Sequence, residues 1–267
     1  YWHWPIPAYL VTKHVAGGAF LYLAVRALGG SFDPTAMAFG GGLGLAALLV
    51  TFALLIYDLD RPDRFLFLFT RPQWRSWIAR AAWLLAGFSA LAGGWWAVEL
   101  GLGAGVLPQG LASLRPAFAA VVAPVAVLAA VYSAFLFAQA EGRDLWQAPH
   151  LVVLLGAQAV LLGAVPFAAA GDPVAAGWVV AGALSALLLA LVDLRTLHGT
   201  EVARLAALEL TRGRFRWWWR GGIAVGYLAP LAAIAAGVPL LAAIAAPIGV
   251  HLASYALVMA PQAIRNS

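Results

Sequence analysis

The sequence predicts an all-α integral membrane protein that crosses the bilayer about eight times as helices. Of its 267 residues, 64% are hydrophobic and only 10% are charged, whereas an ordinary soluble domain has about 25% charged residues. The apolar residues form blocks of about 20, the length that a helix needs to cross roughly 30 Å of hydrocarbon. The stretch 181–192 also lacks the alternation of apolar and polar residues that is typical of barrel strands.

The apolar blocks and the breaks between them place the spans along the chain. The expected spans are, in order, 7–29, 36–57, 76–98, 116–138, 149–170, 173–196, 217–236 and 239–260. Only Gly237-Val238-Pro239 separates the last two. The apolar run around this segment is too long for one span and fits a tight helical hairpin. The whole chain, 1–267, is expected to form one membrane domain.

An even number of spans puts both termini on one membrane face, called the N-face here, together with the loops 58–75, 139–148 and 197–216. Thirteen arginines fall on this face and only Arg26 and Arg115 on the other. The thirteen are Arg61, Arg64, Arg71, Arg75, Arg80, Arg143, Arg195, Arg204, Arg212, Arg214, Arg216, Arg220 and Arg265. By the positive-inside rule the N-face is cytoplasmic. The bias is either this topology signal alone or also a docking surface for a soluble partner.

Ionisable side chains inside a span are costly and are candidates for function. Lys13 and His14 lie about two turns into the first span, roughly 9 to 10 Å beyond Pro7. Lys13 could instead anchor the helix end by extending back to the N-face. His14 is shorter, and a neutral imidazole there could exchange a hydrogen bond and a proton with a quinone carbonyl.

Glycine and tryptophan positions indicate packing and membrane depth. Gly17-Gly18 and the glycines of 40–44 predict close helix packing rather than phosphate loops, because neither group follows a strand. Trp74, Trp77 and residues 217–219 stand at helix starts, where an amphipathic ring favours the headgroup level. These tryptophans therefore predict an interfacial belt.

Two helix ends on the N-face look alike. Residues 54–61 leave the second span and residues 189–195 leave the sixth, each followed by a polar loop and an Arg- and Trp-rich helix start. The likeness suggests a four-helix unit used twice, as 1–140 and 141–267. Four spans separate the copies, so they would share one orientation, as in a parallel repeat. Chance similarity is the alternative.

The fourth span brings polar groups toward the N-face. Tyr132 and Gln139 lie on one stripe by the three-to-four spacing of a helix. The stripe leads into the loop 141–147, in which Glu141, Arg143 and Asp144 carry three charges within four positions. A salt bridge within the loop is the alternative explanation of these charges.

The remaining patterns argue against other chemistry. Two buried histidines on facing helices could hold a haem, but only His14 and His251 look deep and nothing pairs them at matching depth, so haem is not expected. There is no catalytic triad pattern and no HExxH, so neither hydrolytic residues nor metal ligands are expected. The chain has no cysteine, so any iron–sulfur cluster would belong to another subunit.

Four segments resemble the NrfD/PsrC family, the membrane subunits of molybdopterin and iron–sulfur oxidoreductases such as polysulfide reductase. They are Trp4-Pro5-Ile6-Pro7-Ala8-Tyr9 with Ala16-Gly17-Gly18, Asp58-Leu59-Asp60-Arg61-Pro62-Asp63-Arg64-Phe65, Gly142-Arg143-Asp144-Leu145-Trp146-Gln147, and Ala260-Pro261-Gln262. No single motif is specific, but their order and the eight-span layout form a combined signal that covers essentially the whole chain.

The resemblance implies a subunit that binds menaquinone or ubiquinone near the face where an iron–sulfur subunit docks, with a molybdopterin catalytic subunit beyond it. The family's polar residues of helix 1 and tyrosine of helix 4 correspond here to Lys13 or His14 and to Tyr132, and Gln139 joins this expected quinone site. Where the family often has glycines in the first turns of helix 1, this chain has Lys13-His14, which indicates a different quinone or proton route.

The N-face loops supply the other candidates. Asp58 and Arg61 are interpreted either as an ion pair that gates protons or as scaffolding at the end of helix 2, and Glu141 and Asp144 are further proton-transfer candidates. The candidate docking residues are Arg64, Arg71, Arg143, Arg214 and Arg216.

We therefore expect a quinone-reactive anchor subunit of a redox complex in a bacterial or archaeal plasma membrane, with lipid and protein partners and no nucleic acid. The alternatives are a secondary transporter and a purely structural anchor. Transporters usually place polar groups near the bilayer midplane, whereas the polar groups here gather toward one face. An Arg-rich docking face outside the cytoplasm would mimic the positive-inside signal.

Overall fold

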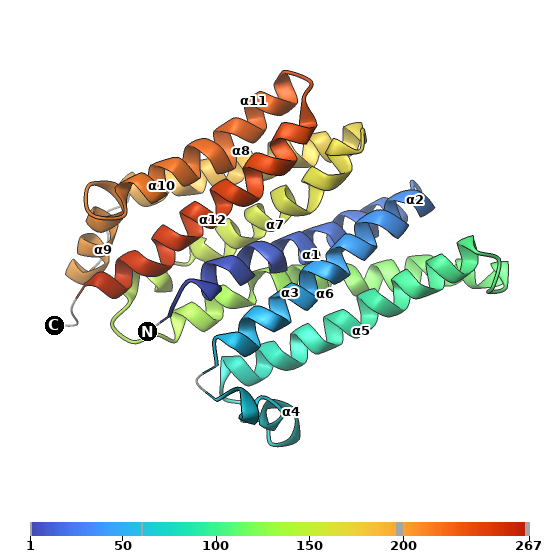
Figure 1. The fold of residues 1–267 in the computed structure, drawn as a ribbon, viewed down its shortest axis with the longest axis horizontal. Helices are drawn as coiled ribbons and strands as arrows, with labels where there is room; N and C mark the ends of the chain where they lie inside the picture. Colours follow the sequence, from blue (N-terminus) through green and yellow to red (C-terminus); the bar gives the residue numbers. More distant parts are fainter. Residues whose placement is uncertain (1, 60, 196–199, 265–267) are drawn as a thin grey trace.

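The computed structural model describes residues 2–59, 61–195 and 200–264, and these parts of the chain contain helices and no strand. Long helices lie side by side along one axis, and α1 begins at the same end of the bundle where α12 ends (Figure 1). This confirms the predicted all-α membrane fold. The side chain of Arg195, and His198 and Arg265 as whole residues, lie outside the described part of the chain.

Seven helical segments of the described chain are long and apolar enough to cross a membrane. They are α1 (Pro5–Leu28), the run of α2 (Pro34–Ala36), the π-helix η1 (Met37–Gly41) and α3 (Gly42–Tyr57), α5 (Trp77–Gly103), the 3₁₀-helix η3 (Gln109–Leu114) with α6 (Arg115–Ala138), α7 (His150–Ala169), α8 (Pro173–Arg195) and α12 (Pro239–Ala263).

An eighth helical segment, 216–235, runs back beside α12 (Figure 1). It consists of α10 (Arg216–Ile223), the π-helix η5 (Ala224–Leu228) and α11 (Ala229–Ala235). Gly237, with a φ of 70°, makes the turn into α12, and Gly226 packs directly on the backbone of Gly249. The predicted hairpin is confirmed. Its Arg- and Trp-rich start makes this segment less apolar than the other seven, so the count of eight membrane crossings stays a prediction, as do the two repeat units.

The structure corrects the predicted end of the third span and fills the N-face loops with short helices. Helix α5 continues past 98 to Gly103, because Glu99 is buried where it accepts hydrogen bonds from Arg115 Nε and Nη2 at 2.7 and 2.8 Å. The additional short elements are η2 (Pro62–Arg64), α4 (Phe67–Thr70), η4 (Asp144–Gln147) and α9 (Glu201–Thr211).

Helix α1 lies in the middle of the bundle, packed against α3, α6, α7 and α12. The predicted close packing at its glycines is confirmed. A Cβ added to Gly17 would lie 3.1 Å from the carbonyl oxygen of Ala126 in α6, and one added to Gly18 would overlap the backbone of Ala159 in α7. Small residues let the backbones touch, and this contact supplies the van der Waals packing that holds membrane helices together.

Gly18→Ala is expected to destabilise the bundle by about 1 to 3 kcal/mol, because the added methyl group overpacks a backbone contact that cannot yield. Gly87→Ala is the matched control, since a Cβ there meets nothing within 4 Å. Thermal unfolding in detergent measures both. Equal midpoints for Gly18→Ala and Gly87→Ala would contradict the packing argument.

A polar cluster ties α1 to the α7–α8 turn at the end of the bundle opposite the N-face. The Tyr22 hydroxyl donates to Asp172, and Arg26 Nη1 lies 3.4 Å from the same carboxylate. Partial burial by itself would raise the pKa of Asp172, but the hydrogen bonds from Tyr22 and the backbone, together with the Arg26 charge, outweigh it and hold the pKa below its usual value. The cluster therefore carries an ionised carboxylate at neutral pH.

Candidate functional site

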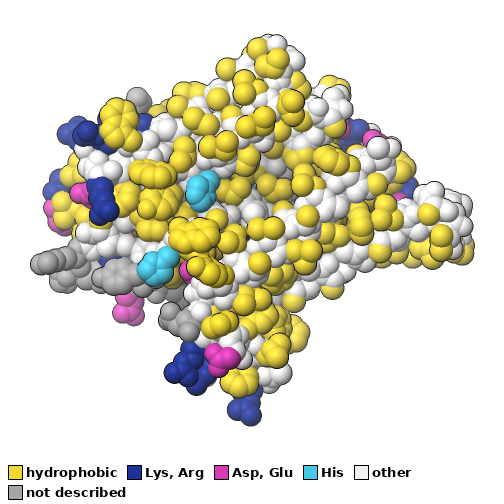
Figure 2. Space-filling view, in the orientation of Figure 1, with side chains coloured by type: hydrophobic (Ala, Val, Ile, Leu, Met, Phe, Trp, Pro, Cys, Tyr) yellow, Lys and Arg dark blue, Asp and Glu magenta, His cyan; other side chains and the backbone are white. Residues whose placement is uncertain are grey.

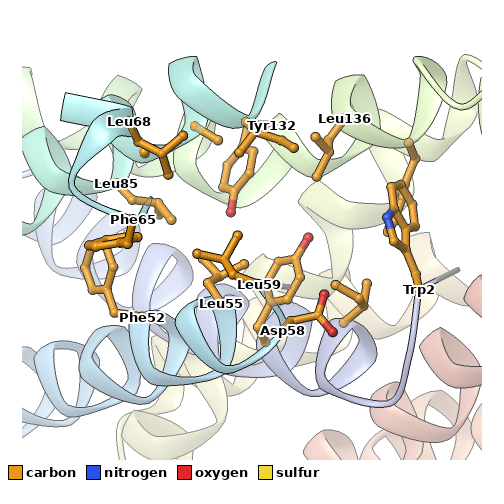
Figure 3. Close-up of a pocket in the computed structure, with 16 residues that line it drawn as sticks. Trp2, Phe52, Leu55, Asp58, Leu59, Phe65, Leu68, Leu85, Tyr132 and Leu136 are labelled. Atoms are coloured by element: carbon orange, nitrogen blue, oxygen red, sulfur yellow. The ribbon is translucent and has the colours of Figure 1, made fainter. Parts of the chain in front are cut away.

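A cavity lies among α1, α3, α5 and α6 at the end of the bundle where α1 begins. Its volume is about 790 Å³, including its open mouth. Phe65 and Leu68, from the η2–α4 segment, close one side, and Phe52, Leu55 and Leu85 form part of the apolar lining (Figure 3). The cavity therefore has the mostly apolar walls that small-molecule sites in proteins share.

Three polar side chains face this apolar space. Tyr9 of α1 and Tyr132 of α6 line it and are only 1% and 3% exposed. Asp58 lines it from the end of α3, and Figure 3 shows Tyr132 and Asp58 on opposite sides of the cavity. The site thus combines two hydroxyl groups and one carboxylate with hydrocarbon walls.

Local sequence places each of these groups. Tyr9 and Ile6 are three residues apart and share one face of α1, while Tyr132 and Leu136 are four apart and share one face of α6. Helix α3 ends at Tyr57, and the next residue, Asp58, still donates its backbone N–H to the carbonyl of Leu54 at 3.0 Å. The carboxylate consequently sits where the helix stops, beside the covering segment.

Lys13 lies behind the cavity wall, wholly buried. Its Nζ donates to the carbonyl of Ala130 and to Ser133 Oγ, both at 2.7 Å, and it lies 4.4 Å from the centre of the Tyr132 ring. Ser133 Oγ is in turn 3.4 Å from the Tyr9 hydroxyl. Lys13 therefore does not extend to the N-face. It is linked to the cavity through Ser133 and Tyr9.

His14 is also wholly buried, but it is not among the residues that line the cavity. Neither ring nitrogen has a hydrogen-bond partner among the described residues. Its neighbours one turn on, Gly17 and Gly18, pack against α6 and α7. The structure thus brings Lys13 and Tyr132 together, as the sequence predicts for a quinone site, and leaves His14 on another side of α1.

Gln139 and the charged loop lie nearer the surface. Gln139 is exposed, and its Oε1 accepts from the backbone of Trp77 at 3.4 Å, away from the cavity. Asp144 accepts a hydrogen bond from Thr200 at the start of α9. Arg143 Nη1 donates to the carbonyls of Pro261 and Ile264 at 2.8 and 2.7 Å. Arg143 and Asp144 therefore bind other segments rather than each other.

The predicted docking arginines, apart from the half-buried Arg143, are exposed, and Arg61 is exposed beside them. Basic side chains gather at the same end of the molecule, over the α9–α10 region and over α4 (Figure 2). Trp217 and Trp218 are exposed at the start of α10, where the sequence predicts an interfacial belt. Glu141 is exposed on the loop between α6 and α7.

Sequence reasoning missed Tyr9 and Trp2 as cavity residues, and it missed Ser133 as the link to Lys13. A signal for Tyr9 was present, because it stands four residues before Lys13 on the same face of α1. No periodic signal marks Trp2, which precedes the helix. Among the described residues, no cluster of three or more His, Cys, Asp or Glu could hold a metal ion.

Comparison with known proteins gives one family. The family model described as "Polysulphide reductase, NrfD" matches residues 1–265. No curated protein matches the chain. The family match spans all of the elements that form the cavity.

Proposed function

The chain belongs to the NrfD family, and on that premise we propose that it binds a membrane quinone in the cavity behind α4 and exchanges electrons with a docked iron–sulfur subunit. Subunits of this family are the membrane parts of molybdopterin oxidoreductase complexes. The single observation that carries the proposal is that Tyr9, Tyr132 and Asp58 face an otherwise apolar cavity at the Arg-rich end of the bundle.

The cavity suits the two parts of a quinone. A ring with carbonyl oxygens needs a few hydrogen-bond donors, which the hydroxyls of Tyr9 and Tyr132 supply. An isoprenoid tail needs hydrocarbon walls, which Phe52, Leu55 and Leu85 supply. Menaquinone and ubiquinone share this chemistry, so the cavity argues for the class rather than for one member.

The protons that quinone chemistry needs give a role to the hydrogen-bonded residues Lys13, Ser133 and Tyr9. Reducing a quinone to a quinol consumes two electrons and two protons, and the reverse reaction releases them. In the proposed mechanism for quinone reduction, the Tyr9 hydroxyl gives one proton to a carbonyl oxygen and regains it through Ser133 from a protonated Lys13, and a protonated Asp58 gives the second proton; quinol oxidation runs both transfers in reverse. Asp58 is a second acid-base group on the opposite side of the cavity. Electrons come from or go to the partner subunit's iron–sulfur clusters.

Ala82→Trp is expected to abolish quinone binding, because Ala82 lines the cavity and an indole would fill the space proposed for the ring. Ala97→Trp on the same helix is the matched control, since Ala97 is exposed and does not line the cavity. The measurement is titration of the chain in lipid nanodiscs with a short-tailed quinone. Equal affinity in both variants would exclude this cavity as the quinone site.

A further inference from the structure

A second hollow opens on the surface at the Arg-rich end of the bundle. It holds about 690 Å³, including its open mouth, and is lined by Trp2, Ala140, Glu141, Arg143, Trp146 and Gln262. Glu141 and Arg143 form its rim, whereas the cavity behind α4 has the carboxylate of Asp58 in its lining. The hollow lies where the α6–α7 loop meets the two ends of the described chain.

Trp2 forms a wall between the two spaces. Among the residues described, it alone lines both the surface hollow and the cavity behind α4, and Figure 3 shows it at one end of that cavity. Its ring stacks on Trp146 with centroids 4.7 Å apart and lies 4.8 Å from Phe137. The two spaces are therefore separated at this point by packed aromatic rings.

Hydrogen bonds fix this wall in place. The backbone N–H of Trp2 donates to Gln262 Oε1 at 2.7 Å, and its carbonyl accepts from Gln262 Nε2 at 3.1 Å. Trp146 is buried, and its Nε1 donates to the carbonyl of Leu257 at 2.9 Å. The backbone of Trp2 and the side chain of its stacking partner Trp146 are thus both hydrogen-bonded, which holds their rings between the hollow and the cavity.

We propose that this hollow receives the cluster-bearing segment of the iron–sulfur partner and that electrons cross between partner and quinone at Trp2. The inference rests on the proposed function and adds the place of docking to it. Electron tunnelling slows steeply with distance, so a transfer route favours the thinnest wall between a surface and the quinone cavity. No electron would need to reside on the indole in this scheme, since one electron at a time would pass directly between the partner's cluster and the bound quinone.

The positive charge of Arg143, which shares the rim with Glu141, fits that occupant. Arg143 is held over the hollow by its bonds to Pro261 and Ile264, so its positive charge is fixed rather than mobile. Iron–sulfur clusters are ligated by cysteine thiolates, whose negative charge a fixed guanidinium complements. The surrounding face is rich in arginine as well (Figure 2). A lipid headgroup or another segment of this chain would be a different occupant, and the experiment below separates these cases.

The test uses the absence of cysteine from this chain. In the purified complex, Glu141→Cys places a single spin label on the rim of the hollow, and Arg204→Cys places one on exposed α9 as the matched control. With the partner's clusters reduced and paramagnetic, the label at position 141 is expected to relax several-fold faster than the label at position 204. The parent complex gives the background from the partner's own thiols.

Equal relaxation at the two positions is expected if a lipid headgroup or another segment of this chain fills the hollow, and faster relaxation at position 204 is expected if the partner docks over α9. Either result would overturn the docking inference. Quinone titration of the same variants keeps the two proposals distinct. Quinone binding without fast relaxation at position 141 would contradict only the proposed docking site. Loss of quinone binding in the parent chain would remove the proposed function itself.

Discussion

Tyr132→Phe is expected to weaken quinone binding about tenfold and to slow quinone-linked turnover at limiting quinone by a similar factor. The ring of Tyr132 is packed in α6 and only 3% exposed, so phenylalanine preserves the wall of the cavity. What disappears is the hydroxyl that faces the cavity. Between mostly apolar walls, a carbonyl that loses this donor is left with an unsatisfied acceptor, which costs free energy.

The measurement is a quinone titration in nanodiscs, followed by turnover of the assembled complex. Tyr57→Phe is the matched control, because Tyr57 is exposed and its ring packs on Trp4 outside the cavity. Dye-linked activity of the soluble subunits reports assembly in both variants. Parent-like affinity in Tyr132→Phe would show that this hydroxyl does not contact the quinone.

The fold was largely predictable because only a few kinds of backbone structure can cross a membrane. Hydrocarbon offers no hydrogen bonds, so apolar blocks of span length must be helices. The hairpin at Gly237 and the close packing at Gly18 also followed from local sequence. The continuation of α5 through Glu99 could not be read from local sequence, because it depends on Arg115 from another helix.

The candidate site was predictable only in part, because its residues come from different helices and their contacts depend on how those helices pack. Lys13 could be singled out as an ionisable group inside a span and Tyr132 as a polar group on one stripe of the fourth span, and the structure places Lys13 Nζ 4.4 Å from the centre of the Tyr132 ring. The direction in which each residue faces depends on helix packing, so the sequence could not separate His14 from Lys13. Trp2 lies outside any helical period, and its place follows from Gln262 at the other end of the chain.

Lys13→Met is expected to lower quinone-linked turnover about a hundredfold while quinone affinity stays close to that of the parent chain. Lys13 does not line the cavity, and methionine is an unbranched side chain that can occupy the same buried space. The substitution removes the amino group that donates to Ser133, and with it the proposed source of a proton for Tyr9.

Ser133→Ala tests the link between Lys13 and Tyr9 separately. It leaves the bond from Lys13 to the carbonyl of Ala130 intact and removes the hydroxyl between Lys13 Nζ and Tyr9. If protons pass along this chain, turnover falls in Ser133→Ala too, and the solvent hydrogen–deuterium isotope effect on turnover changes in both variants. Arg204→Met is the control for loss of a cation, because Arg204 is exposed on α9.

A structural role for Lys13 predicts a different set of results. Loss of packing would lower the thermal midpoint and the quinone affinity together. Loss of a proton source would lower turnover at saturating quinone and leave the thermal midpoint and the quinone affinity unchanged. Because Lys13 is the only lysine in the sequence, isotope-labelled lysine gives one side-chain amino-group signal to follow. That signal is expected to move when quinone binds, since Lys13 contacts the ring of Tyr132 and the hydroxyl next to Tyr9. Parent-like turnover in both Lys13→Met and Ser133→Ala would remove this chain of residues from the proton route and leave Asp58 as the acid-base group of the cavity.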